Sequence, residues 1–279
     1  MAKLIKLKSE LKNIRSQYKQ SRVGFVPTMG NLHEGHLSLM KNAAKKSEVL
    51  FISIFVNPTQ FGPNEDFENY PRTLENDFQL IENLNLNIPV IVFAPDNLQE
   101  VYPKNFKTNF SINTFSHCLC GTSRPGHFNG VLSVIYHLFN LVEPTLAIFG
   151  QKDYQQFIII KSFAEDIFPK VTIEMAPIIR EKSGLALSSR NGYLNSSEKN
   201  EALFLKKTLT TIENDIIHQK LQPIDSYKIN QGKLSWDYLE VLDANNLKEI
   251  SKETKKVLIA GALFVNQKVR IIDNILLEI

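Results

Sequence analysis

The sequence predicts an α/β protein with an open parallel sheet and a smaller C-terminal α+β domain. Over residues 1–178, short apolar runs rich in β-branched and aromatic residues alternate with amphipathic segments of helical period. Continuous apolar runs are typical of strands buried on both faces, as in a parallel sheet. Because strands and helices alternate at this spacing, we expect right-handed crossovers and a Rossmann-like first domain. Residues 179–279 have a different rhythm and should form the second domain, which we expect to act as a lid.

The first domain should begin with a polar, Lys-rich amphipathic helix over residues 1–20. Apolar runs then predict five strands, at residues 22–28, 48–58, 88–95, 145–150 and 170–177. Helices are predicted between them, at residues 34–47, 73–85, 127–144 and 153–169. Thr73 is the expected cap of the second of these helices. The stretch from 58 to 71 is rich in Pro, Gly and Asn, which predicts a loop.

The second domain should begin with a long amphipathic helix over residues 197–221, starting at a Ser cap with acidic residues nearby. Strands are predicted at residues 235–243, 255–265 and 267–279. The last two meet at the sequence VNQK, which predicts a hairpin turn.

Composition argues against several classes of function. The formal net charge is +3, with 32 basic and 29 acidic residues, so no concentrated basic face for nucleic acid is expected. No apolar run approaches the ~20 residues of a membrane span, and the N-terminus lacks the apolar core of a signal peptide. Cys118 and Cys120 have no second cysteine pair with which to bind zinc. We therefore expect two reduced thiols and a cytoplasmic protein.

Candidate ligand-binding residues follow the predicted strands directly, at the edge where open α/β sheets bind their ligands. The first group lies in the stretch PTMGNLHEGH, where His33 and His36 stand at a strand-to-helix turn. These histidines could bind a metal, cap a helix or contact phosphate. No third metal ligand is evident, whereas a helix N-terminus beside two imidazoles favours phosphate. Gly30 and Gly35 would let the backbone approach it closely.

Amide side chains follow the second predicted strand. Asn57 and Gln60 could bind hydroxyl and carboxylate groups without adding charge. The alternative is a purely structural turn, since N-P and F-G-P-N are turn sequences. Both interpretations are compatible with the predicted loop.

Charged and polar residues follow the fourth predicted strand, in the stretch FGQKDYQQF. Gly150 lets the chain turn, Lys152 could bind phosphate and Asp153 could accept a hydrogen bond from a ribose hydroxyl. Gln156 comes one helical turn later. The alternative is an ordinary helix start with Asp153 as its cap.

Two further polar stretches are candidates. Ser188, Ser189 and Arg190 lie in a loop that could close over phosphates and exclude water, although a polar hinge is the alternative. Arg124 and His127 precede the predicted helix 127–144, where a loop and a helix start would also explain them.

Together these groups could hold a nucleoside triphosphate and a small polar acid. Such a pair suggests acyl activation, in which a carboxylate attacks the α-phosphorus, pyrophosphate leaves and an acyl adenylate remains. The sequence lacks a G-x-x-x-x-G-K-[ST] loop, which argues against P-loop phosphoryl transfer. Two alternatives stay open: another nucleotide-transferring enzyme on this fold, such as a cytidylyltransferase, and a nucleotide- or RNA-binding module without activity.

Five stretches resemble, in order and spacing, the pantothenate synthetase (pantoate–β-alanine ligase) family over nearly the whole chain. They are FVPTMGNLHEGHLSL, SIFVNPTQFGPNEDFENYPRT, RPGHFNGV, FGQKDYQQ and REKSGLALSSRN. The first resembles the HIGH signature of the nucleotidyltransferase superfamily. The chain departs from the family pattern at Gln151, Leu187 and Thr145, where Glu, Met and Asp are usual.

This resemblance implies an ATP-dependent ligase that condenses (R)-pantoate with β-alanine to pantothenate. ATP and pantoate would give pantoyl adenylate and pyrophosphate, and the amine of β-alanine would then attack the acyl carbon and release AMP. The resemblance also implies Mg²⁺ with ATP, a homodimer formed through the N-terminal domain, and a cytoplasmic enzyme of pantothenate and coenzyme A biosynthesis. Nucleic acid and membrane are not implied as partners.

The resemblance also implies individual roles. His36 would be the proton donor and His33 its partner on the phosphates, with Lys152 and Arg190 as further catalytic residues. ATP binding is implied for Met29, Gly30, Asn31, Leu32, His33, Glu34, Gly35, His36, Gly150, Gln151, Lys152, Asp153, Ile179, Leu187, Ser188, Ser189 and Arg190. Substrate binding is implied for Gln60, Gln156 and Asn57, and no residue is implied as a metal ligand.

Overall fold

The computed structural model describes residues 2–63, 65–229 and 232–279. The chain forms two compact units. Unit 1 comprises Met1–Ile112, Arg124–Gly150 and Ile159–Pro177, and unit 2 comprises Asn113–Ser123, Gln151–Ile158 and Ile178–Ile279. Unit 2 therefore includes two segments that precede the predicted second domain. Outside the described residues lie Met1 of the predicted first helix, Asn64 of the predicted loop 58–71, and residues 230–231.

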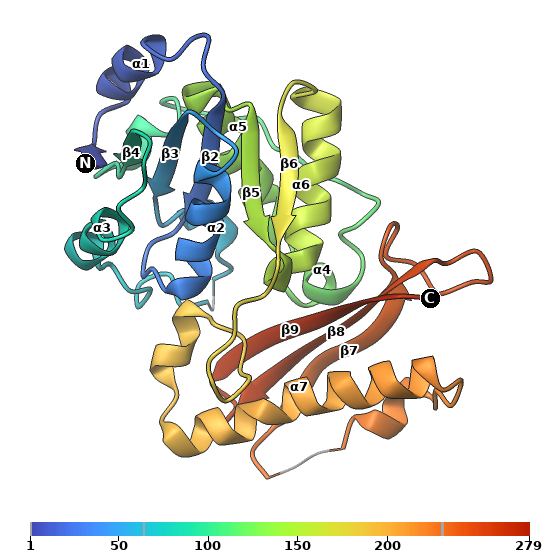
Figure 1. Ribbon diagram of the computed structural model, residues 1–279. Coiled ribbons are helices and arrows are strands. Elements are labelled where there is room, and N and C mark those ends of the chain that lie inside the picture. The colour runs from blue at the N-terminus through green and yellow to red at the C-terminus, as the bar shows by residue number, and fades with distance from the viewer. Residues whose placement is uncertain (1, 64, 230–231) are drawn as a thin grey trace. The chain divides into compact units, whose positions relative to one another are not determined.

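The core of unit 1 is a six-stranded parallel sheet (Figure 1). Its strands are β1 (Ala2–Ile5), β2 (Val23–Thr28), β3 (Val49–Ile54), β4 (Val90–Phe93), β5 (Leu146–Gly150) and β6 (Thr172–Ala176), in the order β1-β4-β3-β2-β5-β6. The five predicted strands and their parallel arrangement are confirmed. From β2 the chain adds β3 and β4 on one side, and it adds β5 and β6 on the other side. The topological switch point therefore lies between β2 and β5.

Helices cover both faces of the sheet because its central strands are apolar on both sides. Leu50, Phe51 and Ile52 in β3 are all fully buried. In Figure 1, α2 lies in front of β2 and also contacts β5, whereas α5 lies on the far face of the sheet. The helices outside the C-terminal segment of unit 2 are α1 (Lys8–Ser16), α2 (Glu34–Ala44), α3 (Leu74–Glu82), α4 (Leu119–Ser123), α5 (His127–Val142) and α6 (Tyr154–Ile167). The predicted helices at 34–47, 73–85, 127–144 and 153–169 are thus confirmed.

The predicted helix over residues 1–20 is wrong at its start. Ala2–Ile5 forms the edge strand β1, which pairs in parallel with β4, and α1 begins only at Lys8. The spacing of apolar residues in this stretch suits a helix as well as a short strand. The pairing with β4 decides between them, because Ile5 becomes buried to 3% exposure in the strand.

Helix α5 packs against the short 3₁₀ helix η1 (Pro58–Gln60), which follows β3. Gly130 makes this approach possible: a Cβ atom at this position would lie 2.1 Å from the carbonyl oxygen of Thr59. Only glycine fits at this position of the HFNGV sequence, and its lack of a side chain allows η1 to lie close to the start of α5.

The C-terminal segment of unit 2 is an antiparallel sheet covered by one long helix (Figure 1). The sheet consists of β7 (Ser235–Asp243), β8 (Lys256–Val265) and β9 (Val269–Glu278), and α7 (Ser196–Ile217) packs on it. The predicted hairpin between β8 and β9 is confirmed, with Asn266 and Gln267 both in the left-handed region. The predicted Ser cap of the long helix is wrong. Asn195 caps α7, in a capping box with Glu198.

Two further observations concern the cysteines and the length of the helices. Cys118 and Cys120 are unpaired thiols, as expected. Within the described ranges, no helix is both long and apolar enough to cross a membrane.

His137 on α5 should make stability depend on pH. It is buried to 7% exposure against the rings of Tyr102 and Phe106, and burial lowers its pKa. Among the described residues, its Nε2 atom has no hydrogen-bond partner. The unfolded chain therefore binds a proton at higher pH than the folded chain, so stability should fall as the pH drops below ~6.5.

We expect His137→Phe to reduce this loss of stability on acidification, as measured by urea unfolding at about pH 7.5 and about pH 5. His117→Phe is the control, because His117 is exposed. An unchanged pH dependence in His137→Phe would contradict the assignment.

Candidate active site

The carboxyl ends of β2 and β5 lie next to each other in unit 1, because these two strands are hydrogen-bonded and parallel. Ligands of open α/β sheets bind at such a switch point. The segment Met29–His33 follows β2 and leads into α2, and Gly150 ends β5. The fold thus puts two of the sequence-predicted groups at the edge where a ligand is expected.

The two histidines of the first motif stack at the N-terminus of α2. Their ring centroids are 4.1 Å apart, and both side chains are half-buried. His33 is the N-cap, since its Nδ1 accepts a hydrogen bond from the backbone N–H of Gly35 at 3.1 Å. Because an accepting Nδ1 cannot carry a proton, neutral His33 carries its proton on Nε2. Capping and anion binding are therefore compatible roles for this residue.

The turn before α2 is held by a residue that the sequence did not single out. The carboxylate of Asp77, on α3, accepts hydrogen bonds from the backbone N–H groups of Asn31 at 2.9 Å and Leu32 at 2.8 Å. Thr73 donates its hydroxyl to the same carboxylate at 3.2 Å, so its side chain does not cap the helix backbone as expected. Burial raises the pKa of Asp77 despite these hydrogen bonds.

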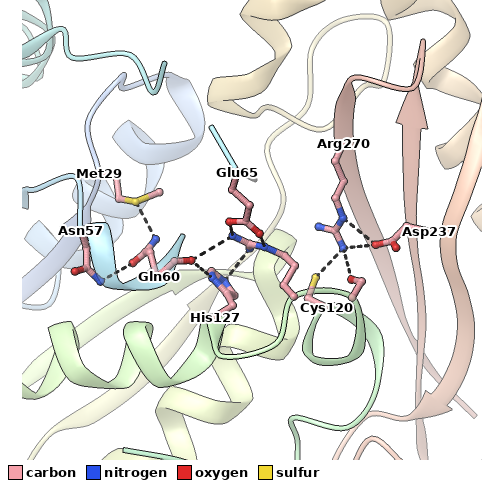
Figure 2. A network of polar contacts seen from close by, with 10 residues as sticks. Met29, Asn57, Gln60, Glu65, Cys120, His127, Asp237 and Arg270 are labelled. Atoms are coloured by element: carbon pink, nitrogen blue, oxygen red, sulfur yellow. Dashed lines mark hydrogen bonds and ion pairs between the residues drawn. The ribbon is translucent and has the colours of Figure 1, made fainter. Parts of the chain in front are cut away.

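Met29, Asn57 and Gln60 form one network at the ends of β2 and β3 (Figure 2). The amide of Gln60 donates to the sulfur of Met29 at 2.8 Å and accepts from Asn57 at 3.1 Å. Asn57 is 1% exposed, and its amide also donates to the carbonyl of Gly130 and accepts from the hydroxyls of Thr59 and Tyr102. The structure therefore brings the first and second motifs together, with Asn57 behind Gln60.

The main chain of Gln60 is held by a second network, which contains the predicted pair Arg124 and His127 (Figure 2). Arg124 binds Glu65 through two hydrogen bonds of 2.7 and 2.6 Å and donates to Nε2 of His127 at 2.9 Å. Since arginine only donates, His127 carries its proton on Nδ1 and donates it to the carbonyl of Gln60 at 2.8 Å. Burial raises the pKa of Glu65, but the hydrogen bonds and charges around it, chiefly those of Arg124, together lower the pKa below its ordinary value.

In unit 2, the short helix η3 (Gln151–Asp153) carries Lys152 and Asp153, which pair at 3.2 Å. Asn274 on β9 holds this turn, since its amide donates to the carbonyls of Gln151 at 2.9 Å and Lys152 at 3.0 Å. Asn274 is 3% exposed, so these hydrogen bonds are shielded from water. The lysine side chain therefore projects from a fixed main chain.

The first turn of α6 contains two glutamines in different settings. Gln156, the predicted substrate-binding residue, is half-buried. Gln155 is 5% exposed and donates to the carbonyls of Phe115 and Cys118 in unit 2. The neighbouring glutamine is thus used to hold the segment that precedes α4.

The predicted loop of residues 187–190 begins beside Ile179, because the N–H of Leu187 donates to the carbonyl of Ile179 at 3.0 Å. Ser188 then caps the 3₁₀ helix η4 (Ser189–Tyr193) by accepting from the N–H of Arg190 at 3.3 Å. Arg180, which leads into this segment, forms a two-bond ion pair with buried Asp273 at 2.6 and 3.0 Å. Of the predicted ATP residues in this loop, Leu187 is therefore held on Ile179, whereas Ser188 caps η4, and Ser189 and Arg190 form its first residues.

The residues that sequence reasoning missed are Asp77, Glu65, Tyr102 and Asn274. Each acts on the main chain or side chain of a predicted residue that is distant in sequence. An Asp in the first turn of a helix or an Asn in a strand carries no local signal of such a partner. In the described part of the chain, no group of three or more His, Cys, Asp or Glu side chains could hold a metal ion.

Comparisons with known proteins identify the family. The family model for pantoate-beta-alanine ligase matches residues 2–276. A pantothenate synthetase from Fervidobacterium nodosum is 45% identical over 284 aligned residues and matches 99% of each chain. A pantothenate synthetase structure from Thermus thermophilus has a TM-score of 0.87 at 34% identity, with 99% of each chain covered.

A second solved structure is that of a pantoate-beta-alanine ligase from Francisella tularensis, complexed with beta-gamma ATP and β-alanine. Its TM-score is 0.76 at 32% identity, and it covers 99% of this chain and 98% of its own. The family match and these relatives all extend over nearly the full length, so the chain belongs to the pantoate–β-alanine ligase family.

Proposed function

We propose that this chain condenses (R)-pantoate with β-alanine in two steps that share one ATP. The pantoate carboxylate attacks the α-phosphorus of ATP, pyrophosphate leaves, and pantoyl adenylate remains bound. The amine of β-alanine then attacks the acyl carbon. The bond between this carbon and the phosphate oxygen breaks, so that AMP leaves and pantothenate is formed. The observation that carries this proposal is the His33–His36 stack at the N-terminus of α2, beside the switch point of the sheet. Membership of the ligase family supports it.

The first step needs stabilisation of charge that moves onto pyrophosphate. We assign this role to the N–H groups at the start of α2 and to the imidazoles of His33 and His36. His36 is the proposed proton donor, and His33 donates from Nε2. Met29–Glu34 and Gly35 would contact ATP through the same turn. These groups are already oriented by the fold, so little reorganisation is needed when charge develops.

Other residues proposed to bind ATP lie in unit 2. Lys152 is assigned to phosphate and Asp153 to the ribose. Gly150, which ends β5 in unit 1, and Gln151 are also assigned to ATP. Ile179 is assigned to the adenine through its main chain. Leu187, Ser188, Ser189 and Arg190 are assigned to the triphosphate, where the guanidinium offers bidentate contact with phosphate oxygens.

Gln60 and Gln156 are the proposed contacts of pantoate and β-alanine. A primary amide can donate to a carboxylate and accept from a hydroxyl at once, which suits a hydroxy acid. Asn57 supports Gln60, because its own amide is already bonded to Gln60, Gly130, Thr59 and Tyr102. The Gln60 network therefore sets the direction in which its remaining amide hydrogen points.

Magnesium ion is proposed to arrive with ATP rather than to occupy a protein cage. Lys152 faces Asp153 and Lys41 faces Glu34, so these acidic residues of the proposed ATP set already have cationic partners. This arrangement agrees with the coordination preference of Mg²⁺, which binds mainly phosphate oxygens and water in nucleotide sites. Bound there, the ion would neutralise phosphate charge. We also propose that the enzyme works in the cytoplasm, which its two free thiols support.

The function is tested by AMP release from ATP. We expect release to require both pantoate and β-alanine, and pyrophosphate exchange into ATP to require pantoate alone. Exchange driven by another acid, with none from pantoate, would contradict the substrate assignment.

His36→Ala should slow pantoate-dependent pyrophosphate exchange by ~100-fold, the scale of one lost transition-state donor. The rate is measured with saturating ATP and pantoate. His218→Ala serves as control, because His218 lies at the exposed C-terminus of α7. Near-wild-type exchange in His36→Ala would remove the imidazole from the mechanism.

Gln60→Ala should raise the KM for pantoate by about tenfold and change the KM for ATP much less, because one hydrogen bond to a charged substrate is lost. Steady-state kinetics with each substrate varied in turn measure both constants. Gln79→Ala on the exposed side of α3 is the control. An effect confined to the KM for ATP would refute the assignment.

A homodimer formed through the N-terminal domain is also proposed, on family membership alone. Sedimentation equilibrium should give about twice the chain mass of 31.9 kDa. A single species of monomer mass would contradict it.

A further inference from the structure

We infer that Asp77 is a positioning residue for phosphate chemistry, acting through the turn that carries His33 and His36. This inference rests on the proposed role of these histidines. It extends that role to a residue on another helix, at which no substrate contact is assigned. The basis is the geometry of the turn and the full burial of the carboxylate.

The turn between β2 and α2 has an unusual main chain. Gly30 and Asn31 both lie in the left-handed region, with φ of 83° and 50°. Turns in which successive N–H groups point to the same side form concave anion-binding sites. The N–H groups of Asn31 and Leu32 form this site, and the two oxygens of Asp77 occupy it at 2.9 and 2.8 Å.

The carboxylate of Asp77 makes most of its hydrogen bonds to this turn. It is 0% exposed, and among the described residues no lysine or arginine forms an ion pair with it. Its third hydrogen bond, from Thr73, is local to α3. A buried carboxylate without a cation is unfavourable unless hydrogen bonds compensate, and two of its three come from this one turn.

The carboxylate also packs directly on the turn. A Cβ atom at residue 30 would lie 3.0 Å from Oδ2 of Asp77 and 3.1 Å from Ile54 on β3. Gly30 is therefore required by its backbone conformation and by the approach of Asp77. Main chain, carboxylate and strand hold each other in one arrangement.

This arrangement determines where the imidazoles lie. The turn runs from Leu32 directly into His33, whose Nδ1 is fixed on the N–H of Gly35 and whose ring stacks on His36. A shift of the turn would move both rings, and displacements of about 1 Å can cost catalysis about 100-fold. The anion site of the turn is filled by the protein itself, so substrate phosphate is left to the helix N-terminus and the imidazoles.

Asp77→Asn is the sharpest test, because it keeps the shape and puts an N–H₂ group against a backbone N–H. We expect the kcat of pyrophosphate exchange to fall by about 10- to 100-fold, with both KM values within about threefold. Thr73→Val removes only the hydroxyl contact and should cause a smaller loss. It also serves as the second variant if Asp77→Asn does not fold.

Asp243→Asn is the matched control. Asp243 is a second buried carboxylate that holds a turn, accepting from the N–H of Asn245 and the hydroxyl of Thr254, both at 2.8 Å. The same change of atoms there should reduce the urea midpoint without lowering kcat. Equal losses of kcat in Asp77→Asn and Asp243→Asn would show a general structural effect and overturn the inference.

A double-mutant cycle separates positioning from general damage. In the His36→Ala background, Asp77→Asn should reduce exchange by less than about threefold, because both changes remove the same interaction. If the two losses multiply fully, Asp77 acts by another route and the inference fails. If His36→Ala is slow but Asp77→Asn and Thr73→Val match wild type, only the Asp77 inference fails. If His36→Ala matches wild type, the proposed role of the histidines fails first.

Discussion

Hydrogen bonds between buried or half-buried side chains and the main chain of turns are the interaction on which the candidate site depends. Three turns that carry proposed substrate-binding residues are held in this way. Asp77 accepts from two N–H groups before α2, Asn274 donates to two carbonyls after β5, and His127 donates to the carbonyl of Gln60. Loops at the carboxyl ends of strands leave such groups unpaired, and an unpaired buried group is costly. In each turn the side chain supplies the hydrogen-bond donor or acceptor for which the main chain has no main-chain partner.

These contacts fix the proposed substrate-binding loops to neighbouring helices and strands. In unit 1, the loop after β3 is fixed by Asn57 and by the pair Arg124 and His127, with Gly130 allowing α5 to come close. In unit 2, the hairpin that contains Leu187 is braced by Arg180 and Asp273. Preorganised donors stabilise developing charge without reorganising during the reaction, which is what adenylate chemistry requires of a protein.

The sequence was informative wherever the signal is local. Buried parallel strands such as β3 are recognisable as unbroken apolar runs, and strand-to-helix turns carry their Gly and His residues in sequence. The edge strand β1 is not predictable in this way, because its four residues fit a helix equally well unless the pairing with β4 is known. The sequence does not distinguish the Ser cap that we predict for α7 from the observed cap Asn195, since both residue types cap helices.

The supporting residues of the site could not be predicted for a different reason. The main-chain partners of Asp77 lie 45 and 46 residues away, and those of Asn274 lie 122 and 123 residues away. Only the tertiary structure relates such positions. The motifs Met29–His36 and Gly150–Asp153 were visible, whereas the residues that orient them look like ordinary polar side chains of a helix and a strand.

Unit 2 is formed by three separate segments of the chain, which limits how the protein can be truncated or recombined. Asn113–Ser123 and Gln151–Ile158 belong to this unit although unit 1 supplies the sequence on both sides of each. A fragment that starts at Ile178 would keep all three strands of the antiparallel sheet. It would nevertheless expose the surface on which Glu240 holds Leu119 and Asn274 holds Gln151. The C-terminal part is therefore not a portable module, and chimaeras between family members should exchange all three segments together.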